Sequence, residues 1–304
     1  MDRTKIFLGL TLVVALVMVV VAGCARARHL TVGSKNFSEQ LILGEIVAQH
    51  LENRLHEKIA RKLDLGGTLV AHQAIVNGEI DLYPEYTGTA LASILKEPPV
   101  SDPAAVLEKV RVGYRHWNLE WMNPLGFDNT FAMAIRNEDA EERHATTLSE
   151  AAQYAPGWKL GVGYEFVQRA DGLAGLLTTY GLHVKGSVKT MDLGLLYQGL
   201  QQRQVDMVAG SATDGLLSIL PVKVLVDDRH YFPPYQAAFI VRSQALTGYS
   251  GLREALGELD GKISTDAMRK MNYQLDGKHR PIREIAREFL RGLGRPQPPA
   301  DGKL

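Results

Sequence analysis

Aromatic and cationic side chains follow several predicted strands of this sequence. Tyr86, Phe131 and Tyr235 are the aromatic residues, and Lys35 and Arg169 are the cationic ones. Ligands of open α/β sheets bind at the carboxyl ends of strands, where these residues are expected. An aromatic face attracts a cation by about 0.5–2 kcal/mol, and a guanidinium binds a carboxylate through two hydrogen bonds. The set therefore indicates a site for a small solute with cationic and carboxylate groups, although Phe131 alone would suit a core and Lys35 alone a solvated surface.

The segment DLYPEYTGTAL, residues 81–91, combines two tyrosines, a proline and a Thr-Gly-Thr sequence. A strand needs neither the proline nor the glycine, and the interior of a helix tolerates both badly. Tyrosine offers an apolar face with one polar group, and hydroxyls beside glycine let a ligand approach the backbone. The segment is interpreted as a strand end that turns into a binding rim. A buried tyrosine followed by an ordinary turn is the alternative.

Signatures of enzymes and metal sites are missing from the sequence. There is no HExxH, GxSxG, Walker phosphate loop or complete GxGxxG, and the nine histidines show no metal-binding spacing. Ser34 and Lys35 could pair as nucleophile and base, but adjacent residues of an extended strand face opposite ways. Cys24 is the only cysteine, which excludes an internal disulfide and a thiolate metal cluster. We predict no catalysis, no cofactor and no metal.

The first 24 residues have the pattern of an export signal. Arg3 and Lys5 precede an apolar stretch over residues 6–21, which ends in Val-Ala-Gly-Cys at Cys24. An uncleaved transmembrane anchor is the alternative, because the stretch nearly reaches the ~18 residues of a span. The small residues before the cysteine resemble a bacterial lipoprotein signal. That resemblance implies a signal peptide over 1–23, lipidation of Cys24, and a membrane-anchored protein facing the periplasm or the extracellular side.

The composition is that of an ordinary globular protein of one or two domains. The chain has 304 residues, 45% hydrophobic and 22% charged, and Lys+Arg and Asp+Glu number 34 each. Because there is no excess of positive charge, a nucleic-acid partner is not expected. Local groups must recognise the ligand.

Short apolar strands alternate with helical stretches along the chain. Residues 30–33 form the first strand, and a helix follows in which Asn36 and Glu39 have the spacing of a capping box. Further strands are expected near residue 80 and at 130–136, 158–163, 205–210, 223–228 and 237–242. This alternation predicts an α/β protein with largely parallel sheets. The polar stretch after residue 135 and the aromatic HYFPPYQ at 230–236 are predicted passages between two lobes.

Several motifs together resemble the substrate-binding proteins of osmoprotectant ABC importers, of the glycine betaine/carnitine/choline type. They are VGSKNFSEQ, HQAIVNGEIDLYPEYTGTAL, DNTFAMAIR, EFVQRADGL, VAGSATDG, VLVDDRHYFPPYQAAFIVR and MNYQLDG, in this order over residues 30–290. The resemblance implies a two-lobed, type II-like periplasmic-binding fold with two crossings. Residues 24–133 and 232–304 are then the first lobe, and 134–231 the second. It also implies a permease and an ATPase as partners and a small zwitterionic or cationic solute.

The resemblance assigns site residues one by one. Tyr86, Phe131 and Tyr235 match aromatic residues of a cage for a trimethylammonium group, while the motifs of Lys35, Thr89 and Arg169 match the carboxylate-binding set. Asp81 and Glu85 are expected to serve structure.

The sequence departs from the family pattern at two of these positions. Phe131 stands where relatives have tyrosine, and Ser211 stands where relatives have a further cage tyrosine. Other betaines such as ergothioneine therefore stay open as ligands. An enzyme on the same two-lobed fold, such as a small-acid dehydratase or lyase, and a ligand-sensing lipoprotein are the alternatives to transport.

Overall fold

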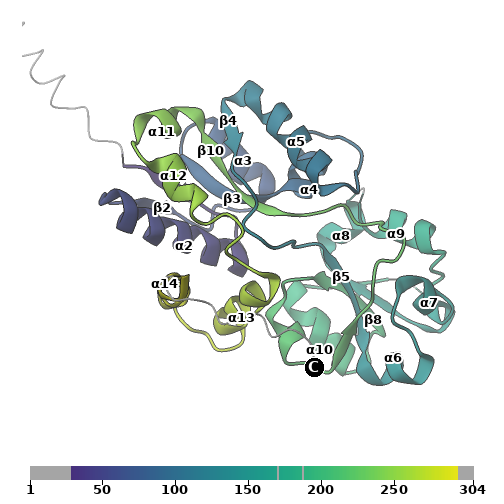
Figure 1. Ribbon diagram of the computed structural model, residues 1–304. Helices are drawn as coiled ribbons and strands as arrows, with labels where there is room; N and C mark the ends of the chain where they lie inside the picture. Colours follow the sequence, from purple (N-terminus) through teal and green to yellow (C-terminus); the bar gives the residue numbers. More distant parts are fainter. Residues whose placement is uncertain (1–28, 170, 187, 294–304) are drawn as a thin grey trace, which may run out of the picture. The chain divides into compact units, whose positions relative to one another are not determined.

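The computed structural model describes residues 29–169, 171–186 and 188–293. The predicted signal peptide over 1–23 and the predicted lipidation site Cys24 lie outside these residues. The chain divides after Leu30, and the unit that begins at Thr31 carries the fold. Within the described residues, this unit contains two five-stranded sheets (Figure 1).

The first sheet has the strand order β2-β1-β3-β10-β4. Its strands are β1 Thr31–Gly33, β2 Ala60–Lys62, β3 Leu82–Tyr86, β4 Leu119–Trp121 and β10 Ala237–Arg242. The helical segments around it are α2 Ser38–Leu55, α3 Thr68–Val76, α4 Thr87–Thr89, the π-helix Ala90–Ile94, α5 Pro103–Tyr114, the short 3-10 helix Arg115–Trp117, α11 Ser243–Gly248, α12 Leu252–Gly257, α13 Thr265–Asp276 and α14 Ile282–Leu293. Helix α2 packs against β1 and β3, and it also contacts α12, α13 and α14 (Figure 1).

The second sheet has the order β7-β6-β8-β5-β9. Its strands are β5 Phe131–Arg136, β6 Leu160–Val162, β7 Lys189–Thr190, β8 Met207–Ser211 and β9 Val222–Val224. Its α-helices are α6 Asn137–Arg143, α7 Leu148–Ala152, α8 Tyr164–Gln168, α9 Leu173–Tyr180 and α10 Leu196–Gln201, and its 3-10 helices are Ala155–Gly157, Leu193–Leu195 and η5 Gly215–Ser218. Thr147 forms a capping box with Glu150 at the start of α7, and Gly181 ends α9 in the left-handed conformation.

Both sheets are mixed, so the expectation of largely parallel sheets is wrong. In the first sheet β1 runs parallel to β2 and β3, while β10 runs antiparallel to β3 and β4. In the second sheet β6 runs parallel to β7 and β8, while β5 runs antiparallel to β8 and β9. The antiparallel strands β5 and β10 are the ones that enter a sheet directly from the other one. They arrive without the crossover helix that makes neighbouring strands parallel.

The two passages between the sheets lie next to each other. The first precedes β5, so its expected place after residue 135 is wrong, because the polar stretch there forms α6. Asp128, before β5, bridges to Gln236, before β10, and the Asp128 carboxylate accepts a hydrogen bond from the Tyr235 backbone N–H at 3.0 Å. Helix α13 also packs against η5, which follows the second sheet's β8. Strand β5 begins at Phe131, so the division into lobes at 133/134 and 231/232, which stays our proposal, falls inside this strand at its first boundary.

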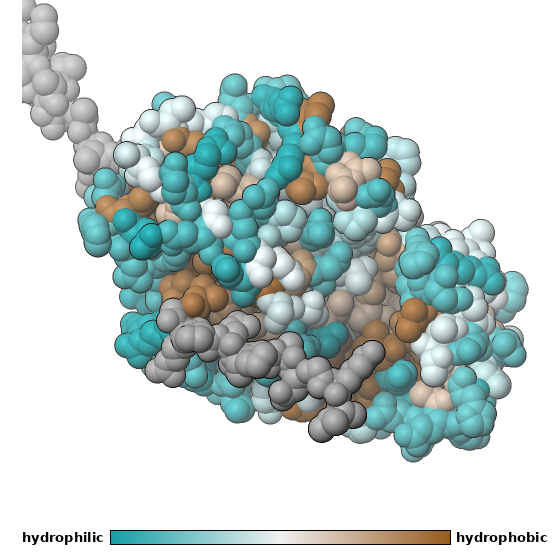
Figure 2. All heavy atoms as spheres, viewed as in Figure 1, coloured by the Kyte–Doolittle hydropathy of each residue, from teal (hydrophilic) through white to brown (hydrophobic). Residues whose placement is uncertain are grey.

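Separate apolar cores support the two sheets. One joins α3, the π-helix and α5 to the first sheet around Tyr83 and Tyr114, which are fully buried. Others join β5, β6 and β8 to the helices of the second sheet. Figure 2 shows mostly hydrophilic residues on the visible face, with hydrophobic residues in smaller groups between them. The burial of apolar area in each sheet's own core provides a rigid base for the residues at the strand ends.

Candidate functional site

Lys35 and Tyr86 meet at the ends of β1 and β3. The Lys35 side chain is almost fully buried, and its Nζ donates a hydrogen bond of 2.5 Å to Glu85 Oε1. Nζ also lies 4.8 Å from the centre of the Tyr86 ring and 5.7 Å from that of Phe37. The two rings stack with their centres 6.3 Å apart. Lys35 is therefore a paired cation between aromatic faces and not a solvated side chain, and Glu85 is its acidic partner.

Glu39 connects Tyr86 with residues from three other parts of the chain. Its Oε1 accepts hydrogen bonds from the Tyr86 hydroxyl at 2.6 Å and from Asn129 Nδ2 at 2.9 Å, and its Oε2 accepts one from Asn272 Nδ2 at 3.0 Å. Burial raises the pKa of this carboxyl, while the hydrogen bonds that it accepts limit the rise. The same Asn272 nitrogen donates to the Thr213 carbonyl beyond β8. Glu39 thus links Tyr86 to the first passage and to the second sheet.

The capping box expected for α2 is wrong. Phe37 is the N-cap residue of α2, and no side chain caps this end. The Glu39 carboxylate is engaged instead by the buried donors of Tyr86, Asn129 and Asn272. Three buried hydrogen bonds outweigh one local bond at the exposed end of a helix, because an unpartnered buried donor costs more.

Ser211 takes part in the same polar network. Its hydroxyl donates to Asn129 Oδ1 and bonds to the Thr213 hydroxyl at 3.0 Å. Ser211 is also the partner of Phe131 across the β5–β8 pair. The position at which relatives carry a cage tyrosine therefore lies beside Phe131 and holds a small polar side chain.

Arg169 forms a tight pair with Asp171. Its Nε donates to Asp171 Oδ1 at 2.7 Å and its Nη2 donates to Oδ2 at 2.6 Å. The Tyr235 hydroxyl also donates to Asp171 Oδ2 and accepts a 3.2 Å bond from Arg169 Nη2. Burial opposes the charged form of Arg169, but hydrogen bonds and charge from Asp171 outweigh it and raise the pKa of the guanidinium. Arg169 is thus a fixed cation whose fork already holds one carboxylate.

Aromatic rings surround this ion pair. The Arg169 guanidinium carbon lies 5.4 Å from the centre of the Phe131 ring and 5.6 Å from that of Tyr235. Phe131 and Tyr235 meet edge to face at 5.7 Å, and Phe131 also contacts Phe166 and Phe232. Both predicted ring faces therefore already lie near a cation of the chain itself, at a distance where cation–π attraction operates.

The Thr-Gly-Thr sequence begins a helix where a turn was expected. Thr87 Oγ1 donates to the Pro234 carbonyl and accepts from the Gln236 backbone N–H at 3.1 Å. A Cβ on Gly88 would lie 2.6 Å from the Pro234 carbonyl oxygen and 2.9 Å from the Tyr235 ring, so only glycine fits here. Thr89 is buried directly after it. The segment thus packs against the second passage and holds Tyr235 in place.

The predicted residues fall into two neighbouring groups. One contains Lys35 and Tyr86, and the other contains Phe131, Arg169 and Tyr235. Thr89 is buried and follows Gly88, which packs against Tyr235. Ser211 lies at the junction, because it touches Asn129 of the Glu39 network and pairs with Phe131.

Four residues of these groups were not predicted as site residues from the sequence: Phe37, Glu39, Asn129 and Asp171. Phe37 follows the first strand as an aromatic residue beside Lys35, and Asp171 lies two residues after Arg169, so both carried a usable signal. Glu39 and Asn129 carried no such signal in the sequence, because their hydrogen-bond partners are distant along the chain. Among the described residues, no group of His, Cys, Asp and Glu side chains is arranged to hold a metal ion.

A family model described as the substrate-binding domain of an ABC-type glycine betaine transport system matches residues 28–292. The chain belongs to this family. A family member captures a solute for an ABC transport system, and the predicted identity of the family is confirmed.

Curated relatives of this family include proteins for several solutes. The chain is 35% identical over 269 residues to an ergothioneine transport permease/ergothioneine binding protein of Helicobacter pylori, covering 88% of this chain and 48% of that protein. It is 32% identical to a carnitine transport binding protein of Listeria monocytogenes, covering 85% of each chain. It is also 32% identical to a glycine-betaine-binding protein of Pseudomonas aeruginosa, covering 89% of each. The chain thus spans about half of the first relative and most of the other two.

Solved structures of the family share the fold. A glycine betaine/carnitine/choline ABC transporter structure superposes with a TM-score of 0.79 and 31% identity, covering 86% of this chain and 98% of that one. Apo YehZ from Escherichia coli superposes with a TM-score of 0.72 and 27% identity, covering 88% and 99%. The predicted α/β fold of two-lobed periplasmic binding proteins is confirmed.

Proposed function

We propose that this member of the family captures a betaine-type solute, with a quaternary ammonium group and a carboxylate, and delivers it to the permease of an ABC importer. The observation that carries the proposal is that Tyr86 lies beside the buried cation Lys35, and Phe131 and Tyr235 lie beside the partly buried cation Arg169. Aromatic faces suit the ammonium group, and the cations suit the carboxylate.

The charge balance of the site favours a zwitterion over a simple cation. Lys35 is paired with Glu85, and Arg169 with Asp171, so each half of the site is close to neutral before a ligand enters. A ligand that carries one charge of each sign preserves this balance. A cation such as choline would enter beside Lys35 and Arg169 without a carboxylate of its own.

Ergothioneine is the second candidate solute, and Ser211 is the observation that favours it. A serine in place of a cage tyrosine leaves more room beside Phe131. An ergothioneine-binding relative at 35% identity is in keeping with a bulkier betaine.

Isothermal titration of the purified full chain with glycine betaine, carnitine, choline and ergothioneine tests the proposal. We expect heat with at least one carboxylated betaine and recovery of that solute unchanged, because the receptor role involves no turnover. Amino acids and sugars serve as controls. Heat with these controls alone, or chemical conversion of a bound solute, would contradict the proposal.

A further inference from the structure

A hollow lies away from the aromatic residues, between α2, the loop before β2, and α14. Its volume is about 670 Å³, within the range of about 300–1,000 Å³ that is common for small-molecule sites. Five cationic side chains line it against two carboxylates, in a chain whose charges otherwise balance. The cationic residues are Lys58, Arg61, Arg283, Arg287 and Arg291.

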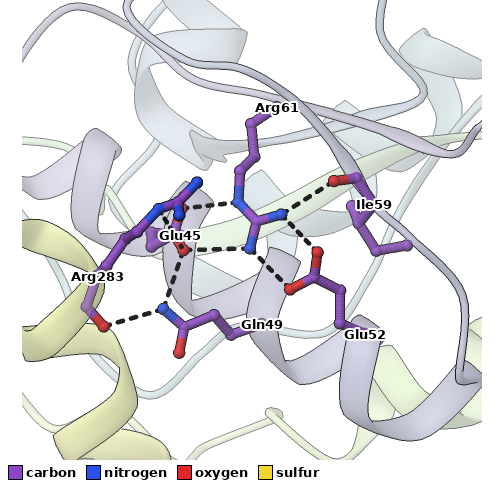
Figure 3. A network of polar contacts seen from close by, with 6 residues as sticks. All are labelled: Glu45, Gln49, Glu52, Ile59, Arg61 and Arg283. Atoms are coloured by element: carbon purple, nitrogen blue, oxygen red, sulfur yellow. Dashed lines mark hydrogen bonds and ion pairs between the residues drawn. The ribbon is translucent and has the colours of Figure 1, made fainter.

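The floor of this basic cavity is a fixed polar network (Figure 3). Arg61 Nε donates to Glu45 Oε2 at 2.9 Å, and its two terminal nitrogens donate to Glu52 at 2.6 and 2.9 Å. Gln49 Nε2 donates to Glu45 Oε1 and to the Arg283 carbonyl, which ties α14 to α2. The charge of Arg61 is thus balanced by two carboxylates, so this residue forms part of the cavity floor and is not a free cation for a ligand.

The remaining cations of the cavity are free to meet a ligand. Arg283 Nε approaches Glu45 only at 3.9 Å, and its side chain is 70% exposed. Lys58, Arg287 and Arg291 are exposed and form no ion pair with any residue in the described ranges. Cationic groups that gather around one hollow without partners repel each other, and a bound anion removes that repulsion.

One side of helix α14, the side that lines the cavity, carries three of its arginines and neither of its acidic residues. Arg283, Arg287 and Arg291 follow each other at steps of four residues and line the cavity, although like charges at this spacing destabilise a helix. The acidic residues of the helix, Glu284 and Glu288, pair with Arg280, so within residues 282–293 none of the three arginines has an acidic partner, and Arg283 has only its 3.9 Å approach to Glu45. The helix therefore retains an unfavourable arrangement on the side that faces the cavity.

We propose that this basic cavity is a second binding site of the protein, for an anion that carries phosphate groups. Guanidinium groups bind phosphate oxygens through paired hydrogen bonds, and several cations around one hollow match a multiply charged group better than a single carboxylate. A free phosphate compound and a phospholipid headgroup share this chemistry. None of the residues of the aromatic site lines the cavity, so the proposal does not depend on the nature of the transported solute.

Isothermal titration of the purified full chain with inorganic pyrophosphate, at low ionic strength, tests the proposal. The double variant Arg287→Gln/Arg291→Gln should weaken this binding by about tenfold or more, because it removes two charge-assisted donors. The matched control Lys262→Gln/Lys270→Gln removes two exposed charges elsewhere and should change it by less than about twofold. Betaine binding should stay unchanged in both variants and report an intact fold.

Vesicles distinguish the source of the phosphate. If a lipid headgroup is the ligand, phosphatidylglycerol should increase the sedimentation of the protein with phosphatidylcholine vesicles. The cavity variant, and not the control, should lose this increase. If the cavity variant and the control lose binding to pyrophosphate and to the vesicles equally, the effect is one of nonspecific charge, and the proposal is overturned. Absence of binding to both probes, or tighter binding of an acidic peptide than of pyrophosphate, would overturn it as well.

Discussion

At the scale of single residues, the function of Arg169 depends on Asp171. The carboxylate is fully buried and held by Arg169 and the Tyr235 hydroxyl, so an alanine at 169 would leave a buried charge without its cation. Loss of folding and loss of ligand binding would then coincide. A variant that neutralises both partners separates these effects.

We expect the double variant Arg169→Gln/Asp171→Asn to fold and to bind carboxylated betaines more weakly by about 2–5 kcal/mol, the scale for removing the partner of a buried charge. Choline should lose much less, because it has no carboxylate. Titration with glycine betaine and choline measures the difference. Tyr235→Ala is the comparison and should weaken both solutes. Equal losses in the double variant would mean that Arg169 acts in lobe closure and not on the carboxylate.

Ser211 tests which betaine the site prefers. Ser211→Tyr should restore a ring beside Phe131 and tighten glycine betaine binding by about 0.5–2 kcal/mol. It should weaken a bulkier natural solute such as ergothioneine, because the ring would fill the same space. Ser211→Ala controls for the lost hydrogen bond to Asn129. If Ser211→Tyr weakens the binding of both glycine betaine and ergothioneine while Ser211→Ala does not, the site has no room for a fourth ring.

At the scale of elements, the buried Glu39 and the partly buried Asp214 lie where α2, α13 and η5 meet. Asp214 caps η5 by accepting a 2.9 Å bond from the Leu216 N–H, and burial raises its pKa to about 6, with help from the charges of Asp276 and Glu39. A carboxyl whose pKa is raised by folding favours the folded state below its ordinary pKa. It loses this contribution as the pH rises through about 6.

The variant Asp214→Asn keeps the cap and removes this titration. Relative to the wild type, its free energy of unfolding should rise by about 1–3 kcal/mol between pH 4 and pH 7.5, given about 1.4 kcal/mol per pKa unit. Urea unfolding at both pH values measures this change. Asp266→Asn, at an 80% exposed carboxylate on α13, should show no such rise. An identical pH dependence in Asp214→Asn and the wild type would contradict the assignment.

Most of the strands that could be predicted from the sequence are buried. The expected strand at 237–242 matches β10 residue for residue, because its apolar run is buried almost throughout. The strands β2, β4 and β7 were not predicted, since each is a sheet edge of only two or three residues, and β2 and β7 are also polar, with the sequences ARK and KT. Likewise, the aromatic and cationic site residues follow visible strands. The contacts of Glu39 join segments up to 233 positions apart and leave no local pattern.

At the scale of the whole molecule, the family and the fold place this chain in an ABC transport system. None of the described helices is long and apolar enough to span a bilayer. We propose that attachment occurs through lipid on Cys24, after removal of residues 1–23. A single acyl chain binds membranes only marginally, so a stable anchor requires more than one chain on this residue.

Intact-mass analysis of the protein from membranes tests this proposal. We expect a chain that begins at Cys24 and carries the added mass of a diacylglycerol and a further acyl group. Cys24→Ala should accumulate with residues 1–23 attached, because the cysteine is the proposed site of processing. An unmodified Cys24 in a chain that still begins with Met1 would show that the apolar stretch over 6–21 is itself the anchor. The mature receptor would then be held by a peptide segment, and its distance from the permease would be set by the residues between 21 and the first strand.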